Sequence, residues 1–216
     1  MSRRRILPSS FYARPTLAVA RDLVGKWLVH DSPEGRTAGR IVEVEAYIGE
    51  SDPACHASRG LTARTAPLYG PPGRAYVYLN YGMHLLLNAV TEQSGRPAAV
   101  LIRALVPVEG EALMRIRRFG GPDSAHGAHE ICRGPGNLGR AMGITLAANR
   151  APLTGGPLTI QDDAVPETDV VWTPRIGVAC GADRYWRCAA RDEAAVSGLR
   201  RWLREGRRRP TPAAIE

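Results

Sequence analysis

The sequence predicts a single α+β domain, and three observations support this fold class. The chain has 216 residues, a length typical of one domain. Several segments have the alternating or continuous apolar pattern of strands, whereas few have a helical pattern. We find no internal repeat and no interdomain linker. We therefore divide the chain into a basic arm (1–9), one domain (10–204) and an arginine-rich tail (205–216).

The expected strands are short apolar or alternating runs. They cover 26–31, 38–49, a hairpin over 75–88, 98–108 and 175–180. In 38–49 the period of two places Glu43, Glu45 and Tyr47 on one face and valines and alanine on the other. The hairpin turns at the Asn-Tyr-Gly of 80–82.

The expected helices follow capping and periodicity signals. Thr16 is a candidate cap for a helix over 17–24, which ends at Gly25. The other expected helices are 109–118, 134–144 and 192–205. The segments between these elements are rich in Pro, Gly or Asp and are expected to be loops, namely 51–73, 119–131 and 150–170.

The charge favours nucleic acid as a partner. The formal net charge is +8, the sequence pI is about 9.8, and Lys26 is the only lysine. Arginine binds phosphate oxygens in bidentate fashion. A GC-rich genome would explain the bias towards arginine but not the excess of positive charge. The arginines at 3–5 and 200–209 are expected to lie in solvated tails that add non-specific affinity.

Several other classes of protein are disfavoured. No run approaches the ~18 apolar residues of a membrane span, and no apolar run follows the basic N-terminus as in a secretory signal. The four cysteines are far apart, which favours free thiols in a reducing cytoplasm. We find no Gly-rich phosphate loop and no serine or cysteine nucleophile motif, so no nucleotide cofactor is expected.

Glu45 is the candidate catalytic carboxylate. It could instead be a surface glutamate on the polar face of a half-exposed strand. Glu43 lies on the same face about 6–7 Å away, a separation like that of paired carboxylates in glycoside hydrolysis. Neighbouring positions on one strand rarely flank a substrate from both sides, so we favour a single catalytic carboxylate.

Two groups of histidine and cysteine could suggest metal binding. His56 follows Cys55 in a small-residue loop, and a second group comprises His126, His129 and Cys132. The first has no supporting ligand spacing and the second has no clear fourth ligand. We therefore expect no metal site, and His56 could also be an ordinary surface histidine.

The hairpin concentrates aromatic side chains. It holds Tyr76, Tyr78 and Tyr81, three of only seven tyrosines. A tyrosine at an exposed tip needs a stacking partner, and side chains can wedge into a base stack. An enzyme that acts on a base must extrude it and stack it between aromatic faces, and a carboxylate can then activate water.

The order of these motifs resembles one known family. The blocks "GRIVEVEAYIGESDPACH", "AYVYLNYGMHLLLNAV", "VLIRALVPVEG", "GPGNLGRAMGI" and "PRIGVACG" are similar to the alkyladenine (3-methyladenine) DNA glycosylases from about residue 8 to 190. The resemblance implies a single compact domain around a curved, mostly antiparallel sheet with a protruding β-hairpin. It implies a base-excision repair enzyme that removes alkylated or deaminated purines from duplex DNA and leaves an abasic site. It also implies a monomer without metal or cofactor, in a bacterial cytoplasm with the nucleoid.

The resemblance also assigns residue roles. Glu45 would activate the attacking water, Arg103 would lie beside that water, and the Ile176 carbonyl would help hold it. The base pocket would consist of Tyr47, His56, Tyr78 and Asn88, with Asn88 disfavouring normal guanine. Tyr81 would fill the gap left by the flipped base, and Met83 would flank it.

Some features limit the resemblance. The family pattern differs at 62–65, at His84 and at Asn137, which leaves the ranking of methylated, deaminated (hypoxanthine) and etheno purines open. Lys26 lies in a separate region, so water, rather than a Schiff base, is expected to release the base. Two alternatives remain, a non-catalytic DNA or RNA binder and an enzyme of free nucleosides.

Overall fold

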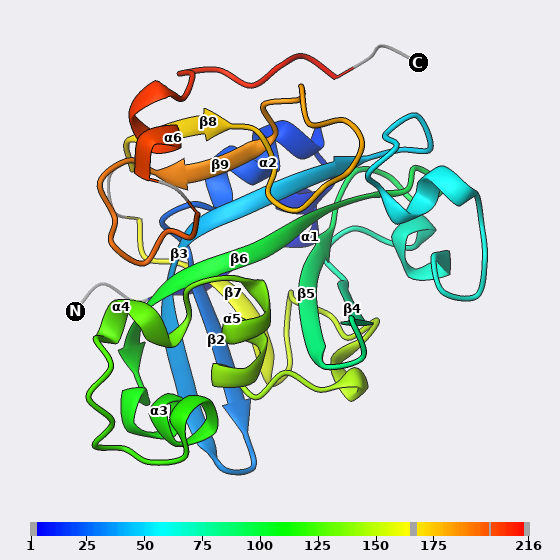
Figure 1. The fold of residues 1–216 in the computed structure, drawn as a ribbon. Helices are drawn as coiled ribbons and strands as arrows, with labels where there is room; N and C mark the ends of the chain where they lie inside the picture. Colours follow the sequence, from blue (N-terminus) through cyan, green and yellow to red (C-terminus); the bar gives the residue numbers. More distant parts are fainter. Residues whose placement is uncertain (1–3, 165–167, 199, 214–216) are drawn as a thin grey trace.

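The backbone is organised around one curled sheet in which every described strand pairing is antiparallel (Figure 1). The structure is a computed structural model that describes residues 4–164, 168–198 and 200–213. The strands are β1 (Arg5–Ile6), β2 (Trp27–Ser32), β3 (Gly35–Ile48), β4 (Ala75–Asn80), β5 (His84–Val90), β6 (Ala98–Glu109), β7 (Leu158–Asp162), β8 (Val170–Thr173) and β9 (Arg187–Ala190). Helices and loops pack on this sheet as one compact domain. The predicted α+β class is confirmed.

Strand β3 is the centre of the sheet. One edge pairs with β6 along most of its length, and the other edge pairs first with β2 and then with β9. Val44 and Ala46 are fully buried in the main apolar core on one face, as the alternation predicted. Glu43 and Glu45 share the other face, and both are also fully buried.

The helices cover the ends and faces of the sheet. They are α1 (Ser9–Tyr12), α2 (Thr16–Leu23), α3 (Glu111–Phe119), α4 (Ala128–Ile131), α5 (Pro135–Ala141) and α6 (Arg200–Glu205), with 3-10 turns at His56–Arg59, Ala66–Tyr69 and Leu146–Ala148. Helix α5 lies directly against β5. The approach is so close that a Cβ atom at Gly139 would stand 2.1 Å from the Leu85 carbonyl oxygen. Only glycine allows this approach.

The protruding hairpin has the tight turn that its sequence predicted. Strand β4 ends at Asn80, β5 begins at His84, and these two residues pair with each other. The Met83 N–H donates to the Asn80 carbonyl. The two central residues, Tyr81 (φ 48°) and Gly82 (φ 70°), have positive φ, as a type I′ turn requires. This turn leaves Tyr81 85% exposed and Met83 71% exposed.

The C-terminal third differs from the prediction. Residues 150–170 were expected to be irregular, but β7 lies there and pairs with β1 and β2, and β8 begins at Val170. The expected strand over 175–180 is wrong. That segment consists of bends around Gly177, whose φ of 74° breaks an extended chain. Strands β8 and β9 lie on either side of it.

The helix predicted over 192–205 is shorter in the structure, where only α6 is helical. Gly198, with a φ of 85°, breaks the helical backbone just before α6. The expected loop over 119–131 contains the single turn α4. Thr16 does not cap α2 with its side chain. It is the first helical residue, and its hydroxyl bonds to Thr91 and Glu92 instead.

The predicted arms pack on the domain where they are described. Residues 5 and 6 of the basic arm pair with β7 and so extend the sheet. The C-terminal segment runs past β8 and α6 (Figure 1), and Arg207 exchanges two backbone hydrogen bonds with Trp172. Residues 1–3 and 214–216 lie outside the described residues, and the boundaries at 9/10 and 204/205 stay predictions.

Candidate active site

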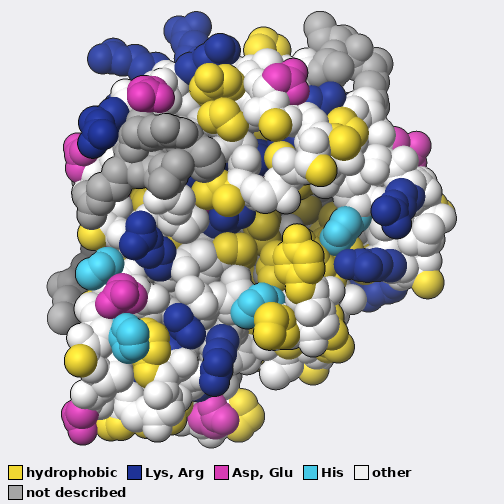
Figure 2. Space-filling model, in the orientation of Figure 1, with side chains coloured by type: hydrophobic (Ala, Val, Ile, Leu, Met, Phe, Trp, Pro, Cys, Tyr) yellow, Lys and Arg dark blue, Asp and Glu magenta, His cyan; other side chains and the backbone are white. Residues whose placement is uncertain are grey.

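A cavity of about 410 Å³ opens between the hairpin, the loop after β3 and the bends that follow β8. Figure 2 shows hydrophobic side chains around a hollow to the right of centre, with histidines near it and basic side chains on both sides. The lining residues are Tyr47, Pro53, Ala54, Cys55, His56, Leu68, Tyr76, Tyr78, Asn80, Tyr81, Leu86, Asn88, Ala99, Leu101, Arg103, Pro135, Ile176, Gly177, Val178, Ala179 and Cys180. This volume is in the range of small-molecule sites.

Glu45 lies directly behind the cavity wall. Its side chain is fully buried and accepts three hydrogen bonds. The Ile176 N–H donates to Oε1 at 2.7 Å, and the Tyr47 hydroxyl and Arg103 Nη1 donate to Oε2 at 2.8 and 3.0 Å. All three donor residues line the cavity, so groups of the cavity wall hold the carboxylate in place. The reading of Glu45 as a surface glutamate is wrong.

Arg103 bridges the two buried glutamates of β3. Its Nε donates to Glu43 Oε1 at 2.7 Å and its Nη1 to Glu45. A register shift aims the side chain, because Glu43 pairs with Ala104 while Val44 pairs with Ile102, so Arg103 has no opposite residue on β3. Bulges of this kind re-aim side chains near functional sites. Burial opposes its charge, but the two carboxylates raise the pKa of Arg103 and keep it cationic.

Glu43 is the shared counterion of two buried arginines. It accepts hydrogen bonds from Arg103, Arg187 and both the N–H and hydroxyl of Ser197. Burial alone would raise its pKa, but Arg103 and Arg187 outweigh burial and lower the pKa to about 2. Neither Glu43 nor Glu45 is among the lining residues. The choice between one catalytic carboxylate and a pair stays a prediction.

A second buried ion pair lies near Glu45. Arg175 donates to both carboxylate oxygens of Asp52, at 2.6 and 2.8 Å, and neither side chain is exposed. Its guanidinium also lies 4.7 Å from the centre of the Tyr47 ring. Burial and the neighbouring Glu45 raise the pKa of Tyr47, so its hydroxyl stays protonated as a donor. This pair joins the loop after β3 to the segment that carries Ile176.

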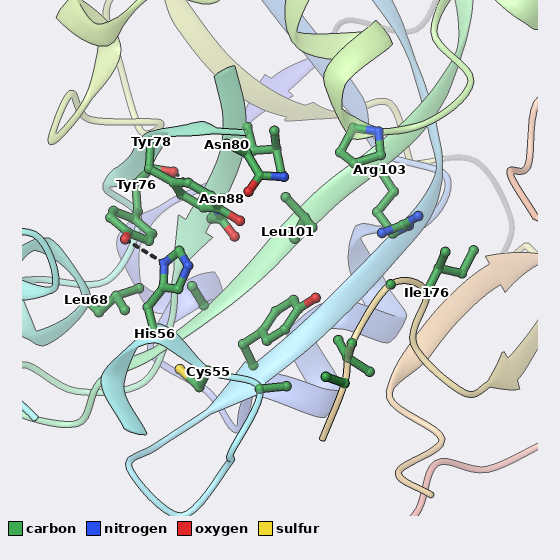
Figure 3. A pocket seen from close by; sticks show the side chains of 18 of the residues that line it. Cys55, His56, Leu68, Tyr76, Tyr78, Asn80, Asn88, Leu101, Arg103 and Ile176 are labelled. Atoms are coloured by element: carbon green, nitrogen blue, oxygen red, sulfur yellow. Dashed lines mark hydrogen bonds between the residues drawn. The ribbon is translucent and has the colours of Figure 1, made fainter. Parts of the chain in front are cut away.

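Aromatic rings form the opposite wall. Figure 3 shows Tyr76, Tyr78 and His56 together on one side of the cavity. The His56 and Tyr78 rings meet edge to face at 4.5 Å, and His56 Nδ1 bonds to the Tyr76 hydroxyl at 2.9 Å. Burial and then Arg64 and Arg59 lower the pKa of His56 below its ordinary value. The imidazole is therefore neutral near pH 7 and leaves one ring nitrogen for a ligand.

Cross-strand pairs of the hairpin line the cavity on this side. Tyr76, Tyr78 and Asn80 share one face of β4, opposite Asn88, Leu86 and His84 on β5. The Asn88 amide is buried and donates to the Tyr76 carbonyl at 3.0 Å.

The structure brings together most of the predicted site. Around one cavity lie Glu45, Arg103, Tyr47, His56, Tyr78, Asn88, Ile176 and, at its rim, Tyr81. Met83 does not line the cavity and projects into solvent beyond the turn. For Ile176 the structure shows the N–H on Glu45, whereas the expected role belonged to its carbonyl.

The positions that depart from the family pattern, at 62–65, His84 and Asn137, do not line the cavity. His84 packs against α5, because a Cβ atom at Gly136 would meet its ring at 2.7 Å. Asn137 donates to the Arg133 carbonyl within the same helix region. In the segment 62–65, the Thr65 hydroxyl accepts from the Thr62 N–H and closes a small turn.

Within the described ranges no group of three or more His, Cys, Asp or Glu side chains could hold a metal ion. The four cysteines are free thiols, three of them buried. None of the helices in the described part of the chain has the length and apolar run needed to span a bilayer.

Reasoning from the sequence missed Asp52, Arg175, Arg187 and Ser197. The Asp52 and Arg175 pair spans 123 residues of sequence, and Arg187 and Glu43 are 144 residues apart. Local patterns cannot reveal pairs at that separation. The one available signal is an arginine within a buried strand such as β9. Because buried charges are paired, such an arginine indicates an acidic partner elsewhere in the fold.

Comparison with known proteins agrees with this geometry. The family model for methylpurine-DNA glycosylases (MPG) matches residues 10–194. A relative from Methanocella arvoryzae, named as a proposed 3-methyladenine DNA glycosylase, is 52% identical over 195 residues, which cover 89% of this chain and 96% of the relative. Relatives with the same name from Myxococcus xanthus and Rubrobacter xylanophilus are 46% and 47% identical, over 94% and 87% of this chain and 98% and 95% of their own lengths. The chain belongs to the methylpurine-DNA glycosylase family.

Proposed function

We propose that this protein flips alkylated or deaminated purines out of duplex DNA and hydrolyses their N-glycosidic bond with water. Membership of the family makes the chain a monofunctional DNA glycosylase of base-excision repair. The observation that carries the finer proposal is the ion-paired Glu45 behind an aromatic cavity, beside an exposed tyrosine turn. The proposed setting is the cytoplasm, with the protein acting as a monomer.

The cavity suits a damaged purine. Tyr47 and the pair His56 and Tyr78 supply aromatic faces on two sides, which attract a cationic methylpurine through cation–π interactions. Asn88 at the inner end of the hairpin would meet the edge of the base and disfavour guanine through its exocyclic amino group. Extrusion costs a few kcal/mol, least for a damaged base.

Glu45 can act on the sugar in two ways. As the bond breaks, positive charge develops on the sugar, and a carboxylate nearby stabilises it. An ionised carboxylate has about four acceptor sites, and three are already occupied by Tyr47, Arg103 and the Ile176 N–H. No described donor occupies the fourth, which would orient the attacking water, and the Ile176 carbonyl would hold that water from its other side.

Tyr81 would enter the gap that the flipped nucleotide leaves in the duplex. The turn presents it next to the cavity mouth, since the same residue is both exposed and a lining residue. Met83 would contact the neighbouring base pair. The single lysine supports release by water, because Lys26 Nζ pairs with Asp162 and does not line the cavity.

The test uses duplex DNA with one methylpurine or one hypoxanthine, incubated with protein and excess chelator. Free base and strand breaks are assayed before and after hot alkali. We expect free base from at least one lesion, with breaks only after alkali. Glu45→Gln should still bind damaged DNA but release base at least about 100-fold more slowly. Full activity of that variant would remove Glu45 from the mechanism, and tight binding without release by wild type would favour a binding protein.

A further inference from the structure

Arg187, the first residue of β9, is a buried cation outside the cavity. It is fully buried, does not line the cavity, and has a hydrogen bond from each nitrogen of its guanidinium. We infer that Arg187 is a positioning residue that holds both oxygens of the Glu45 carboxylate in place through two separate routes. This inference rests on the proposed role of Glu45.

The first route passes through Glu43. Arg187 Nε donates to Glu43 Oε1 at 2.7 Å, and the same oxygen accepts from Arg103 Nε at 2.7 Å. Arg103 then donates its Nη1 to Glu45 Oε2. Two guanidinium groups thus share one carboxylate oxygen, and the orientation of Arg103 depends on where Arg187 fixes that oxygen.

The second route passes through the chain that follows β8. Arg187 Nη1 donates to the Thr173 hydroxyl oxygen at 2.7 Å, and Thr173 lies opposite Arg187 in the β8 and β9 pair. Three residues later the Ile176 N–H donates to Glu45 Oε1 at 2.7 Å. Arg187 therefore fixes the start of the segment that holds the other oxygen of Glu45.

Ser197 contacts both Glu43 and Arg187. Its N–H and hydroxyl donate to the two oxygens of Glu43, at 2.7 and 2.8 Å, and its carbonyl accepts from Arg187 Nη2 at 2.5 Å. Ser197 lies beyond residue 194, where the family match ends. Loss of Arg187 would leave Glu43 with fewer positive partners in a buried site, and its remaining contact with Arg103 would be free to shift.

The experiment compares Arg187→Met, Arg187→Lys and Thr173→Val in the full chain. The readouts are the single-turnover rate of base release at saturating enzyme and the Kd for undamaged duplex. We expect Arg187→Met to slow release about 100-fold, since small misplacements near the chemistry have effects of this size, with little change in Kd. Arg187→Lys should recover part of the rate, because it keeps the charge but cannot bond three partners in the same geometry. Thr173→Val should slow release about tenfold through the second route alone.

Two controls separate positioning from a general loss of stability. Ile160→Ala removes buried apolar atoms in β7, away from the cavity, and should lower the melting temperature without changing the single-turnover rate at 20 °C. The double variant Arg187→Met with Glu43→Gln should be no slower than the slower single variant, since the two substitutions share the route through Arg103.

Amide hydrogen exchange at Ile176 supplies a readout that does not depend on activity. Arg187→Met should lose protection at this amide, and Ile160→Ala should not. If wild type released no base from any lesion, the proposed function would fail, while this exchange result would still test the positioning. Protection and rate in Arg187→Met equal to those of Ile160→Ala, or no recovery with Arg187→Lys, would overturn the inference. If Arg187→Met does not fold, Thr173→Val and Arg187→Lys decide by the same measurements.

Discussion

Tyr81 combines an unfavourable backbone with an exposed ring. Its φ of 48° lies in the left-handed region, which bulky residues rarely adopt. No packing offsets this conformation, since the ring is 85% exposed. Strain of this kind clusters at functional sites. The tyrosine is therefore best explained by what it contacts when DNA is bound.

Replacing Tyr81 by asparagine should separate stability from function. Asparagine tolerates the left-handed region, and Asn-Gly is the preferred sequence for a type I′ turn. We expect Tyr81→Asn to raise the free energy of unfolding by up to about 1 kcal/mol. Base release should fall by about 10- to 100-fold, because a stacking contact of about 1–3 kcal/mol is lost. Urea unfolding and single-turnover assays would measure both, and an unchanged rate would contradict the wedge assignment.

Glu43 should control the stability of the protein in acid. Its pKa of about 2 in the folded state is below the ordinary value of 4.5. A depressed carboxyl pKa stabilises the fold above pH 4.5, and that stability is lost as the pH falls towards 2. The loss is about 3 kcal/mol at most. The free energy of unfolding, measured by urea titration at each pH, should fall less steeply between pH 5 and pH 2.5 in Glu43→Gln than in wild type, and equal slopes would contradict this account.

At the scale of elements, long strands with a strong sequence pattern were predictable from the sequence, and short strands with a weak pattern were not. The 12 to 14 residues of β3 and β6 alternate or stay apolar long enough to be recognised. Strands β8 and β9 have only four residues each and owe their conformation to pairing with β3 and with each other. The apolar run over 175–180 resembles a strand, yet Ile176 and Val178 are apolar because they line the cavity.

The same distinction applies to the site. Glu45 and Tyr47 were identifiable because the alternation of one strand brings them together. Arg103 was placed beside the attacking water through the family resemblance, and in the structure it donates a hydrogen bond to the Glu45 carboxylate. Arg187 could not be identified, because its partner Glu43 lies 144 residues away and its strand has no clear pattern. Sheet topology alone creates that contact.

The bend at Gly177 offers a test at this scale. Its φ of 74° strains any other residue, although a Cβ atom there would meet nothing within 4 Å. We expect Gly177→Ala to cost about 1 kcal/mol of stability and to slow base release about tenfold by moving the adjacent Ile176 N–H. Gly120→Ala is the matched control, since Gly120 has a φ of 84°, equally open space and a place at the end of α3. Equal rates in the two variants would contradict this account.

For the whole molecule, the excess of positive charge matters only where acids do not neutralise it. Arg36 contacts both Asp31 and Glu109 at the far end of β3. Arg64 is exposed in the loop beside the cavity, with its guanidinium 5.6 Å from the Tyr78 ring. We therefore assign Arg64, rather than Arg36, to the surface that meets phosphates.

This assignment predicts how salt affects binding. Arg64→Gln and Arg36→Gln each lower the formal net charge of +8 by one unit. The slope of log Kd against log salt for duplex DNA should become shallower by about 1 in Arg64→Gln. It should stay at the wild-type value in Arg36→Gln. Fluorescence anisotropy from 50 to 300 mM salt measures both, and equal slopes would place the DNA elsewhere.

The long separations around Glu43 have a consequence for synthesis of the chain. Its partners Arg187 and Ser197 follow it by 144 and 154 residues. On the ribosome, domains form as the chain emerges from its N-terminal end, so Glu43 is translated long before these two partners. The nascent protein thus lacks an organised Glu45 until almost its full length has been made. If Glu45 acts as proposed, an incomplete translation product would lack the contacts that base release requires.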